Sequence, residues 1–506
     1  NGSNGIAAWG ETNTVTNTGA ISGYVNGIIS GGYATVDNYG SITGDTTSGV
    51  YLTKGKVTNH AGSKIYLTDS GADSSAILFA GYGEVENSGE IKGTGGIHFG
   101  VDGKVTNNAG GTITGTGGWG IIFGNSGTLI NHGAIEGVTG VTFNMYNSGG
   151  SESINDTLTN SGTIIGTGGT AVDMSVGDDT ANLLSGSSIT GNVDGGAGTD
   201  TVNLTGSGNI TNGILLNFET IEKSGTGTFT LGGGLSSGNH ISVFGGVIRA
   251  NGAFAHEAGA TYTVGAGADG NLGKISAETA TIKGGTVALD TVIGARGGTH
   301  SIVGTDSGLT GTYDLFSAAT DSDYIAAALS YDANNAYITL TSNFAGAALT
   351  ENQQAVATSL DATYSTASGD MLNVYGAIST LSTPAIRLAY DQMGGASHTA
   401  FAAIDVYRVA SFYRNLFRST PSSPTGTSVT GTYFPALFAA NTAVTSDAVS
   451  VPSAKMKGRR DGPFLLWIRG YEASGNRDGD DIASRYDFTI GGTVAGIEYR
   501  VGPAIR

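Results

Sequence analysis

The 506-residue sequence contains no cysteine, only 7 prolines, and no apolar run that approaches membrane-spanning length. The absence of cysteine excludes disulfide bonds. It favours a chain that crosses an oxidising compartment unfolded, because an early disulfide would block its passage; a cytosolic protein is the alternative. A membrane-spanning helix needs about 18 or more consecutive apolar residues, so no transmembrane helix is expected.

Basic residues are also scarce, with 23 Lys and Arg against 41 Asp and Glu, and the net charge is −18. The excess of acid lies in residues 1–345, since residues 346–506 hold equal numbers of both signs. Such a surface repels nucleic acid, so no nucleic-acid partner is expected. Glycine is abundant, at 86 residues, but without the Gly-X-Y period of collagen. Hydrophobic residues make up 39% of the chain, enough for a packed core.

One phrase recurs through residues 1–166: an apolar residue, any residue, asparagine, then glycine and a second apolar residue. It first reads VTNTGAISG from Val15 and last reads LTNSGTIIG from Leu158. Its asparagines are Asn17, Asn38, Asn59, Asn87, Asn107, Asn131 and Asn160. A second phrase lies between the copies, an apolar-x-apolar pair: Val50/Leu52, Ile77/Phe79, Ile97/Phe99, Ile121/Phe123, Val141/Phe143 and Val172/Met174. A period of roughly 20 to 30 residues indicates a stacked architecture.

Each unit consists of short β-type runs and cannot bury its apolar residues alone. Because alternate residues of a strand share a face, the apolar residues of both phrases are predicted to point inward and stack at about 4.8 Å per coil. The repeated asparagine is predicted in a turn, where it bonds backbone groups and tolerates the left-handed region. We therefore predict a mainly β chain with a parallel β-helix over residues 1–345. A leucine-rich repeat has a similar period, but the dense leucine framework that it needs is absent.

The composition changes near residue 345. Thr350 and Gln353 have the spacing of a helical capping box, and Pro384 suits the first turn of a later helix. These signals predict a helical junction at residues 346–418. Residues 419–462 are rich in Ser, Thr, Pro and Gly, which is typical of a flexible linker. Residues 463–506 contain two β-type runs, and the alternation around Phe488 and Ile490 predicts the first strands of an incomplete antiparallel barrel.

The C-terminal segments resemble those of bacterial autotransporters, the type V secretion family. LTENQQAVATSLD (349–361), LAYDQMGGASHTAF (388–401) and VASFYRNLFR (409–418) resemble the family's helical junction, and LWIRGYEASGNRDGDD (466–481) with YDFTIGGTVAGIEYR (486–500) is similar to the opening of its translocator barrel. The glycine-rich segments 186–208 and 217–233 look like common passenger phrases.

The resemblance implies a pertactin-like passenger with a right-handed parallel β-helix. It implies export through a C-terminal outer-membrane barrel, placed by the barrel-assembly machinery of a Gram-negative bacterium. The passenger would then be displayed at the cell surface or released. By position, a folding-nucleating segment would lie at about residues 245–345.

Serine-hydrolase motifs match only in part. Thr305-Asp306-Ser307-Gly308 lacks the first glycine of the Gly-Asp-Ser-Gly motif, and Asp69-Ser70-Gly71 is no better. Gly234–Gly238 fits Gly-x-Ser-x-Gly in letters, but no helix is predicted after it, as a nucleophile elbow requires. We interpret all three as chance matches in a chain rich in glycine and serine.

No acid–base pair for glycan cleavage emerges either. Asp178 and Asp179 are adjacent, so on a strand they would face opposite ways. Arg249 and Arg296 lie far from any acid cluster, which a polysaccharide lyase would need. We predict no catalytic residues, no cofactor and no enzyme activity; a polysaccharide lyase or hydrolase on a β-helix scaffold is the alternative.

One segment, 195–203, matches a calcium-binding nonapeptide, with Asp194 and Asp200 as its carboxylates. Calcium arrays need ligands from adjacent turns, and one copy supplies too few oxygens. No metal is therefore predicted, and we interpret the segment as a structural turn. His60 and His132 follow repeat asparagines and are also predicted in turns.

The remaining candidates are aromatic. Trp9 and Trp119 are predicted to face outward and either contact glycans or pack locally. A long rod with a repeating acidic surface suits extended, multivalent contact. We therefore predict a non-enzymatic adhesin or self-association factor, whose partner is a glycan or protein on a host or neighbouring cell. A purely structural surface layer is the third alternative.

Overall fold

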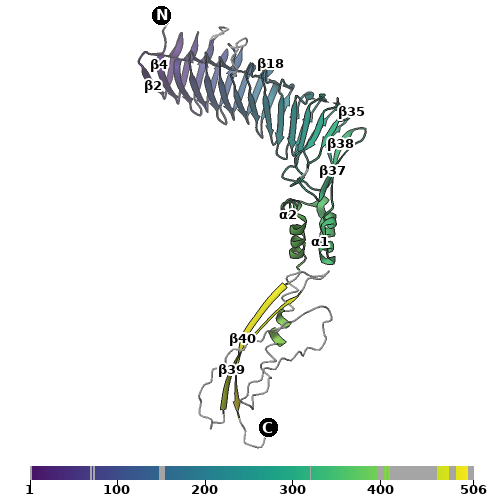
Figure 1. Ribbon diagram of the computed structural model, residues 1–506. Coiled ribbons are helices and arrows are strands. Elements are labelled where there is room, and N and C mark those ends of the chain that lie inside the picture. Colours follow the sequence, from purple (N-terminus) through teal and green to yellow (C-terminus); the bar gives the residue numbers. More distant parts are fainter. Residues whose placement is uncertain are drawn as a thin grey trace, which may run out of the picture. The chain divides into compact units, whose positions relative to one another are not determined.

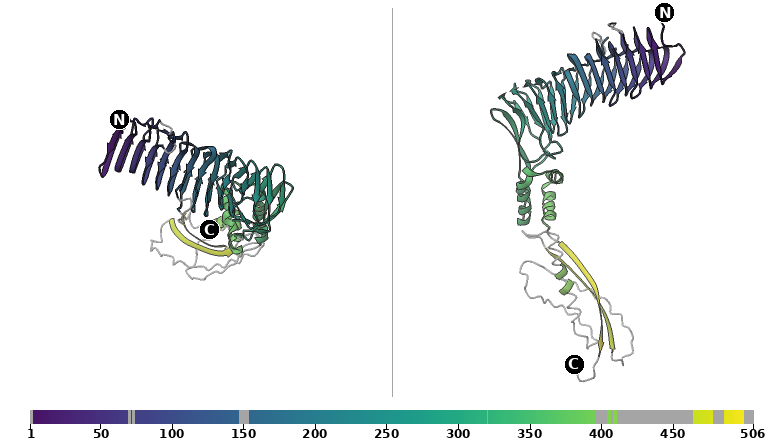
Figure 2. Two further views of the ribbon diagram at one scale, coloured as in Figure 1. Left: turned by 90° about the horizontal axis from the view of Figure 1, so that it is seen from above. Right: turned by 180° about the vertical axis from the view of Figure 1, so that it is seen from behind.

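A computed structural model describes residues 3–68, 71, 74–146, 154–319, 321–395, 404–406, 408–410, 464–477 and 486–499. The chain divides into two compact units: Asn1–Ser342 with Tyr364–Thr380, and Asn343–Thr363 with Leu381–Arg506. The first unit is a parallel β-helix, as the sequence predicts (Figure 1). Figure 2 shows its stacked rungs from two further directions.

Each coil of the β-helix contributes up to three strands, which we assign to three sheets. We call the first the pair sheet, because the apolar-x-apolar pairs lie on or at the ends of its strands from β6 to β18. It contains β1 (Ile6–Ala8), β4 (Asn26–Asn38), β6 (Ser48–Asn59), β8 (Ser75–Phe79), β11 (Gly95–Phe99), β14 (Trp119–Phe123), β16 (Ala134–Thr142), β18 (Thr163–Asp173), β20 (Ser188–Asp194) and β23 (Leu215–Leu216). At the same place in later coils, a separate four-stranded sheet contains β26 (Leu235–Ser236), β29 (Ala253–His256), β32 (Thr279–Ile282) and β35 (Leu309–Gly311).

The asparagine sheet carries the repeat asparagines. It contains the second halves of β4 and β6 with β2 (Thr12–Asn17), β9 (Gly83–Asn87), β12 (Gly103–Asn107), β15 (Gly127–Asn131), β17 (Thr157–Asn160), β19 (Thr180–Leu183), β21 (Thr201–Thr205), β24 (Thr220–Ser224), β27 (His240–Phe244), β30 (Thr261–Gly265), β33 (Thr286–Leu289) and β36 (Leu315–Ser317). The third sheet contains the first halves of β16, β18 and β20 with β3 (Ala20–Gly23), β5 (Ser41–Gly44), β7 (Lys64–Leu67), β10 (Glu90–Gly93), β13 (Thr112–Gly115), β22 (Gly208–Thr211), β25 (Thr228–Leu231), β28 (Val247–Ala250), β31 (Lys274–Ala277) and β34 (Gly298–Thr305).

The predicted inward ladder of the asparagine sheet is confirmed. Its members are register partners from coil to coil: Val15, Val36, Val57, Val85, Val105, Leu129 and Leu158. All of them are 0% exposed except Val15, which lies in the first described coil and is half-buried. A short β-type run therefore buries its apolar residue only because the next coil covers it.

The apolar pairs form a second inward ladder, and its aromatic members stack. The rings of Phe79 and Phe99 have centroids 5.1 Å apart, those of Phe99 and Phe123 5.2 Å, and those of Phe123 and Phe143 4.9 Å. Glycine lies beside these rings. A Cβ at Gly103 would lie 2.4 Å from the Phe99 ring, so this corner needs a residue without a side chain.

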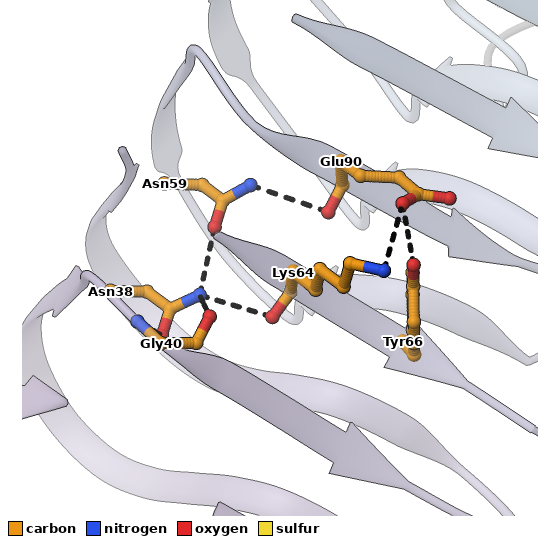
Figure 3. Close-up of polar contacts among 6 residues, drawn as sticks. All are labelled: Asn38, Gly40, Asn59, Lys64, Tyr66 and Glu90. Atoms are coloured by element: carbon orange, nitrogen blue, oxygen red, sulfur yellow. Dashed lines mark hydrogen bonds and ion pairs between the residues drawn. The ribbon is translucent and has the colours of Figure 1, made fainter. Parts of the chain in front are cut away.

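The repeat asparagines end their strands, and their side chains point into the rod. Asn38 donates from Nδ2 to Asn59 Oδ1 at 2.8 Å and to the Lys64 carbonyl at 3.0 Å, as Figure 3 shows. The same side-chain bond of 2.8 Å joins each neighbouring pair from Asn17 to Asn160. We call this row the asparagine ladder. The predicted turn bonds are present, since Gly40 N donates to Asn38 Oδ1 at 3.2 Å.

The repeat asparagines lie at the ends of strands rather than within the turns where they were predicted, and they do not use the left-handed region that asparagine tolerates. The non-glycine residues with positive φ among the described residues are Asn144, Ser175, Asn212 and Asn217, and none of them is a repeat asparagine. Each repeat asparagine is the last residue of its strand and keeps extended backbone, because its side chain bonds both the turn and the next coil.

The β-helix ends in an antiparallel arrangement. β34 pairs with β38 (Asn335–Ser342), which pairs with β37 (Ile325–Tyr331), both antiparallel. The 3₁₀ helix η2 (Tyr364–Thr366) and α2 (Asp370–Ser379) belong to the same unit. The Tyr364 and Tyr375 rings lie 5.0 Å apart, and both are buried.

The second unit contains η1 (Phe344–Ala347), α1 (Glu351–Thr363), α3 (Thr383–Met393), β39 (Phe464–Arg477) and β40 (Tyr486–Tyr499). The capping box is confirmed: Gln353 N donates to Thr350 Oγ1 at 3.3 Å, and Thr350 N donates to Gln353 Oε1 at 3.3 Å. Pro384 lies in the first turn of α3, as predicted. β39 and β40 pair antiparallel, and the predicted linker at 419–462 lies outside the described residues. None of the described helices has the length and apolar character needed to cross a membrane.

Candidate functional site

Exposed aromatic side chains gather at one corner of the first coils, between the pair sheet and the asparagine sheet. Tyr33 is the register partner of Lys54, and the Tyr82 carbonyl accepts from Gly55 N at 3.2 Å, so these three residues follow one another on successive coils. Trp9 lies against Gly31 of the same corner, where a Cβ would lie 2.7 Å from its ring. Trp9 is 70% exposed, Tyr33 41% and Tyr82 51%. We call Trp9, Tyr33, Lys54 and Tyr82 the aromatic corner.

The other aromatic candidates are held by local packing. Trp119 is half-buried at the start of β14, and its Nε1 is enclosed. His60 lies in a turn, as predicted, and stacks on Tyr39 with ring centroids 3.8 Å apart. His132 also lies in a turn, and its Nδ1 is 2.6 Å from Ser161 Oγ. The structure therefore leaves Trp9 as the sequence-predicted tryptophan with an open ring face.

The serine motifs do not assemble a nucleophile site among the described residues. Gly234–Gly238 runs through the short strand β26, and Ser237 is fully buried, where its hydroxyl accepts from Glu257 N. Asp306 of the Thr305–Gly308 motif forms an ion pair with Arg249 at 2.5 Å. The two residues are 57 positions apart in the sequence, so this ion pair could not be predicted from their spacing. Asp69-Ser70-Gly71 lies mostly outside the described residues.

Lys223 is a further buried group that the sequence pattern did not reveal. Its side chain is 0% exposed and points into the rod from β24, between Leu204 and Val243. The ammonium donates to the carbonyls of Ser224 at 2.7 Å and Gly225 at 2.9 Å. Burial lowers its pKa to about 8. We interpret Lys223 as a structural group, because it satisfies backbone carbonyls inside the core.

The calcium-like segment forms a tight turn, and its two carboxylates bind different backbone groups. Asp194 Oδ1 accepts from Gly196 N at 3.1 Å, whereas Asp200 Oδ1 accepts from Asp179 N at 2.8 Å. Asp178 and Asp179 face opposite ways, as predicted, although they lie in a turn rather than on a strand: Asp178 is exposed and Asp179 is 1% exposed. Over the described ranges, no three His, Asp or Glu side chains are arranged to hold a metal ion.

The buried acids belong to a column that we call the acidic column: Asp156, Asp179, Asp200 and Glu219. Each precedes a threonine that begins a strand of the asparagine sheet, at the place where earlier coils carry glycine, such as Gly127. Each carboxylate accepts the backbone N–H of the equivalent residue one coil earlier, at 2.5 Å from Gly127, 2.6 Å from Asp156, 2.8 Å from Asp179 and 2.8 Å from Asp200. The repeated acid–Thr–apolar phrase is the sequence signal for this column, and it was not recognised from the sequence alone.

Comparison of the sequence with protein-family models and with curated proteins gives no match. The positions of the side chains therefore indicate what this surface can do. The aromatic corner offers exposed rings and one lysine on successive coils, which suits binding. The three aspartates of the acidic column are buried, which suits a structural role rather than direct contact with a substrate.

Proposed function

We propose that this chain is the passenger of a bacterial autotransporter with its helical junction and the first strands of its translocator barrel. The passenger then acts at the cell surface, or after release, as a non-enzymatic adhesin or self-association factor. A parallel β-helix, capped helices after residue 343 and a C-terminal antiparallel strand pair support this proposal. The barrel would lie in the outer membrane, placed there by the barrel-assembly machinery.

The observation that carries the binding role is the aromatic corner. Tyr and Trp supply large contact area at low cost in conformational entropy, and such residues dominate the energetics of many interfaces. Here they project from a rod whose coils are spaced by about 4.8 Å, so several rings can engage one extended ligand at once. The apolar faces of sugar rings would fit these rings, which favours a cell-surface glycan as the partner.

The triple variant W9A/Y33A/Y82A is tested in the full chain against the surface glycan or protein that the wild type binds. We expect its affinity to fall at least about tenfold, because removing an interface anchor typically costs about 2 kcal/mol. Binding to panels of immobilised glycans and matrix proteins measures this loss. Tyr24→Ala is the matched control, since Tyr24 is 60% exposed at another corner. Equal binding by both variants contradicts the role of the aromatic corner. Release of reducing sugar ends by the wild type contradicts the non-enzymatic role.

A second prediction concerns export. The segment nearest the barrel emerges first, and its coils form from local contacts, so residues 245–345 are expected to nucleate folding outside the cell. Val36→Asp and Val287→Asp place the same buried charge in matched sites, because both valines are 0% exposed on one inward ladder. We expect Val287→Asp to reduce surface passenger several-fold more than Val36→Asp does, measured by protease accessibility on intact cells. Equal export of the two variants contradicts a C-terminal nucleus.

A further inference from the structure

In the buried aspartates of the acidic column, the two oxygens of each carboxyl group differ in their hydrogen bonding. In Asp156, Asp179 and Asp200, Oδ1 accepts one backbone N–H, while Oδ2 is buried and has no hydrogen-bond partner among the described residues. The three residues are 1%, 1% and 0% exposed, respectively. An ionised carboxylate needs several donors to replace lost water, and one donor is too few. The geometry therefore favours the neutral acid.

The charged groups around the column are acidic as well. Asp156 faces Asp179 and Asp102, and Asp179 faces Asp200 and Asp178. Asp200 faces Glu219, Asp178 and Asp194. Among the described residues, no lysine, arginine or histidine forms an ion pair with any member of the column. Like charges stacked one coil apart, at about 4.8 Å, cannot all ionise without a cost.

We propose that the acidic column is a proton-operated lock in the middle of the β-helix. Protonated, the carboxyl groups of Asp156, Asp179 and Asp200 tie coil to coil through the backbone bonds that they accept. Ionised, they repel one another inside a buried corner, and the coils that carry them, residues 156–219, open more readily. The lock acts on the rod itself and is independent of what the outer surface binds.

The direction of the titration follows from burial. Desolvation raises the pKa of Asp156 to about 8, of Asp179 to about 7 and of Asp200 to about 6, while the backbone N–H bonds oppose the shift and the neighbouring acids add to it. The unfolded chain has an aspartate pKa of about 3.9. Because the folded pKa values are raised, the stabilisation is fully present below about pH 4 and is lost as the pH rises through 6 to 8.

The test is hydrogen exchange of the full chain at about pH 5.5 and about pH 8.5, with rates corrected for the intrinsic pH dependence of exchange. We expect residues 156–219 to exchange at least about tenfold faster at the higher pH, since one unit of pKa shift corresponds to a tenfold change. Coils near Val57, which carry glycine in place of the acids, serve as the internal reference. Equal corrected rates for residues 156–219 at both pH values overturn the proposal.

A neutral variant separates charge from shape. The triple substitution D156N/D179N/D200N keeps an acceptor oxygen for each backbone N–H and removes the ionisable groups. We expect it to stay protected at about pH 8.5, whereas Glu136→Gln, an exposed acid on β16, leaves the wild-type pH dependence unchanged. A triple variant with the same pH dependence as the wild type contradicts the lock. So does calcium that restores protection at about pH 8.5 in the wild type alone, because the column is then a cation site.

If the triple variant fails to fold, infrared spectroscopy of the wild type decides the matter. A protonated carboxylic acid has a carbonyl band distinct from that of a carboxylate. We expect a band from buried acids at about pH 6, where free aspartate is ionised, and its loss as the pH rises above about 8. A spectrum with only carboxylate at about pH 6 overturns the proposal.

Discussion

Replacing Phe123 by alanine is expected to lower the free energy of unfolding by about 3–5 kcal/mol, the cost of a large cavity in a packed core. The Phe123 ring is 0% exposed and stacks between Phe99 at 5.2 Å and Phe143 at 4.9 Å. Gly127 also packs against it, since a Cβ there would lie 2.6 Å from the ring. A backbone held this close cannot collapse far into the cavity, so the full cost is expected. Urea denaturation measures the change.

The part of the rod that loses stability in Phe123→Ala tests how the coils stack. Each coil of a solenoid contacts only its neighbours, so Phe123→Ala should accelerate hydrogen exchange mainly in the coils of residues 97–143. Phe123→Leu keeps much of the apolar volume and should cost less, and Tyr82→Ala, which removes an exposed ring, should cost little. A uniform increase in exchange along the whole rod contradicts stacking between nearest neighbours.

The inward ladders could be predicted because two rules act at the same positions. Alternation along a strand decides which residues face inward, and a fixed phrase decides which residues meet in the next coil. Val57, for example, is placed by its phrase alone, and the structure pairs it with Val36 and Val85. The capping box of Thr350 and Gln353 was predictable for a similar reason, since both bonds lie within one helical turn.

The ends of the strands were harder to predict, because the chain changes direction just beyond them. Asn107 follows Val105 by two positions, so alternation places it on the same inward face. Asparagine is mostly exposed in proteins, so its type argues for the opposite, solvent-facing position. Only stacking from coil to coil gives it partners inside the rod. Ion pairs between distant residues could not be predicted either. Arg249 and Asp306 form one, but no repeated phrase in the sequence relates their positions.

The second large loss of stability is expected when the asparagine ladder is interrupted. Asn107 Nδ2 donates to Asn131 Oδ1 at 2.8 Å, and Asn107 Oδ1 accepts from Asn87 Nδ2 at 2.8 Å. Asn107 Nδ2 also bonds the Gly111 and Ala134 carbonyls at 3.3 Å and 3.2 Å. Asn107→Ala removes all four bonds at once and leaves buried donors and acceptors on both neighbouring coils. Each unsatisfied group costs about 1–3 kcal/mol, so we expect a loss of about 2–5 kcal/mol in the free energy of unfolding.

Asn108→Ala is the matched control for this prediction. Asn108 is the next residue along the chain and is half-buried, but among the described residues its side chain bonds Ser88 Oγ alone, at 3.0 Å. Its loss should cost less than about 1 kcal/mol, the usual net value of one partly solvated hydrogen bond. Asn17→Ala, in the first described coil, should fall between the two, because Asn17 bonds one ladder neighbour, Asn38, and backbone groups of Gly19 and Ser41 at the less covered end of the rod. Urea denaturation of the three variants gives the order directly. Equal costs for Asn107→Ala and Asn108→Ala would show that the ladder adds no more stability than a single partly solvated side-chain bond does.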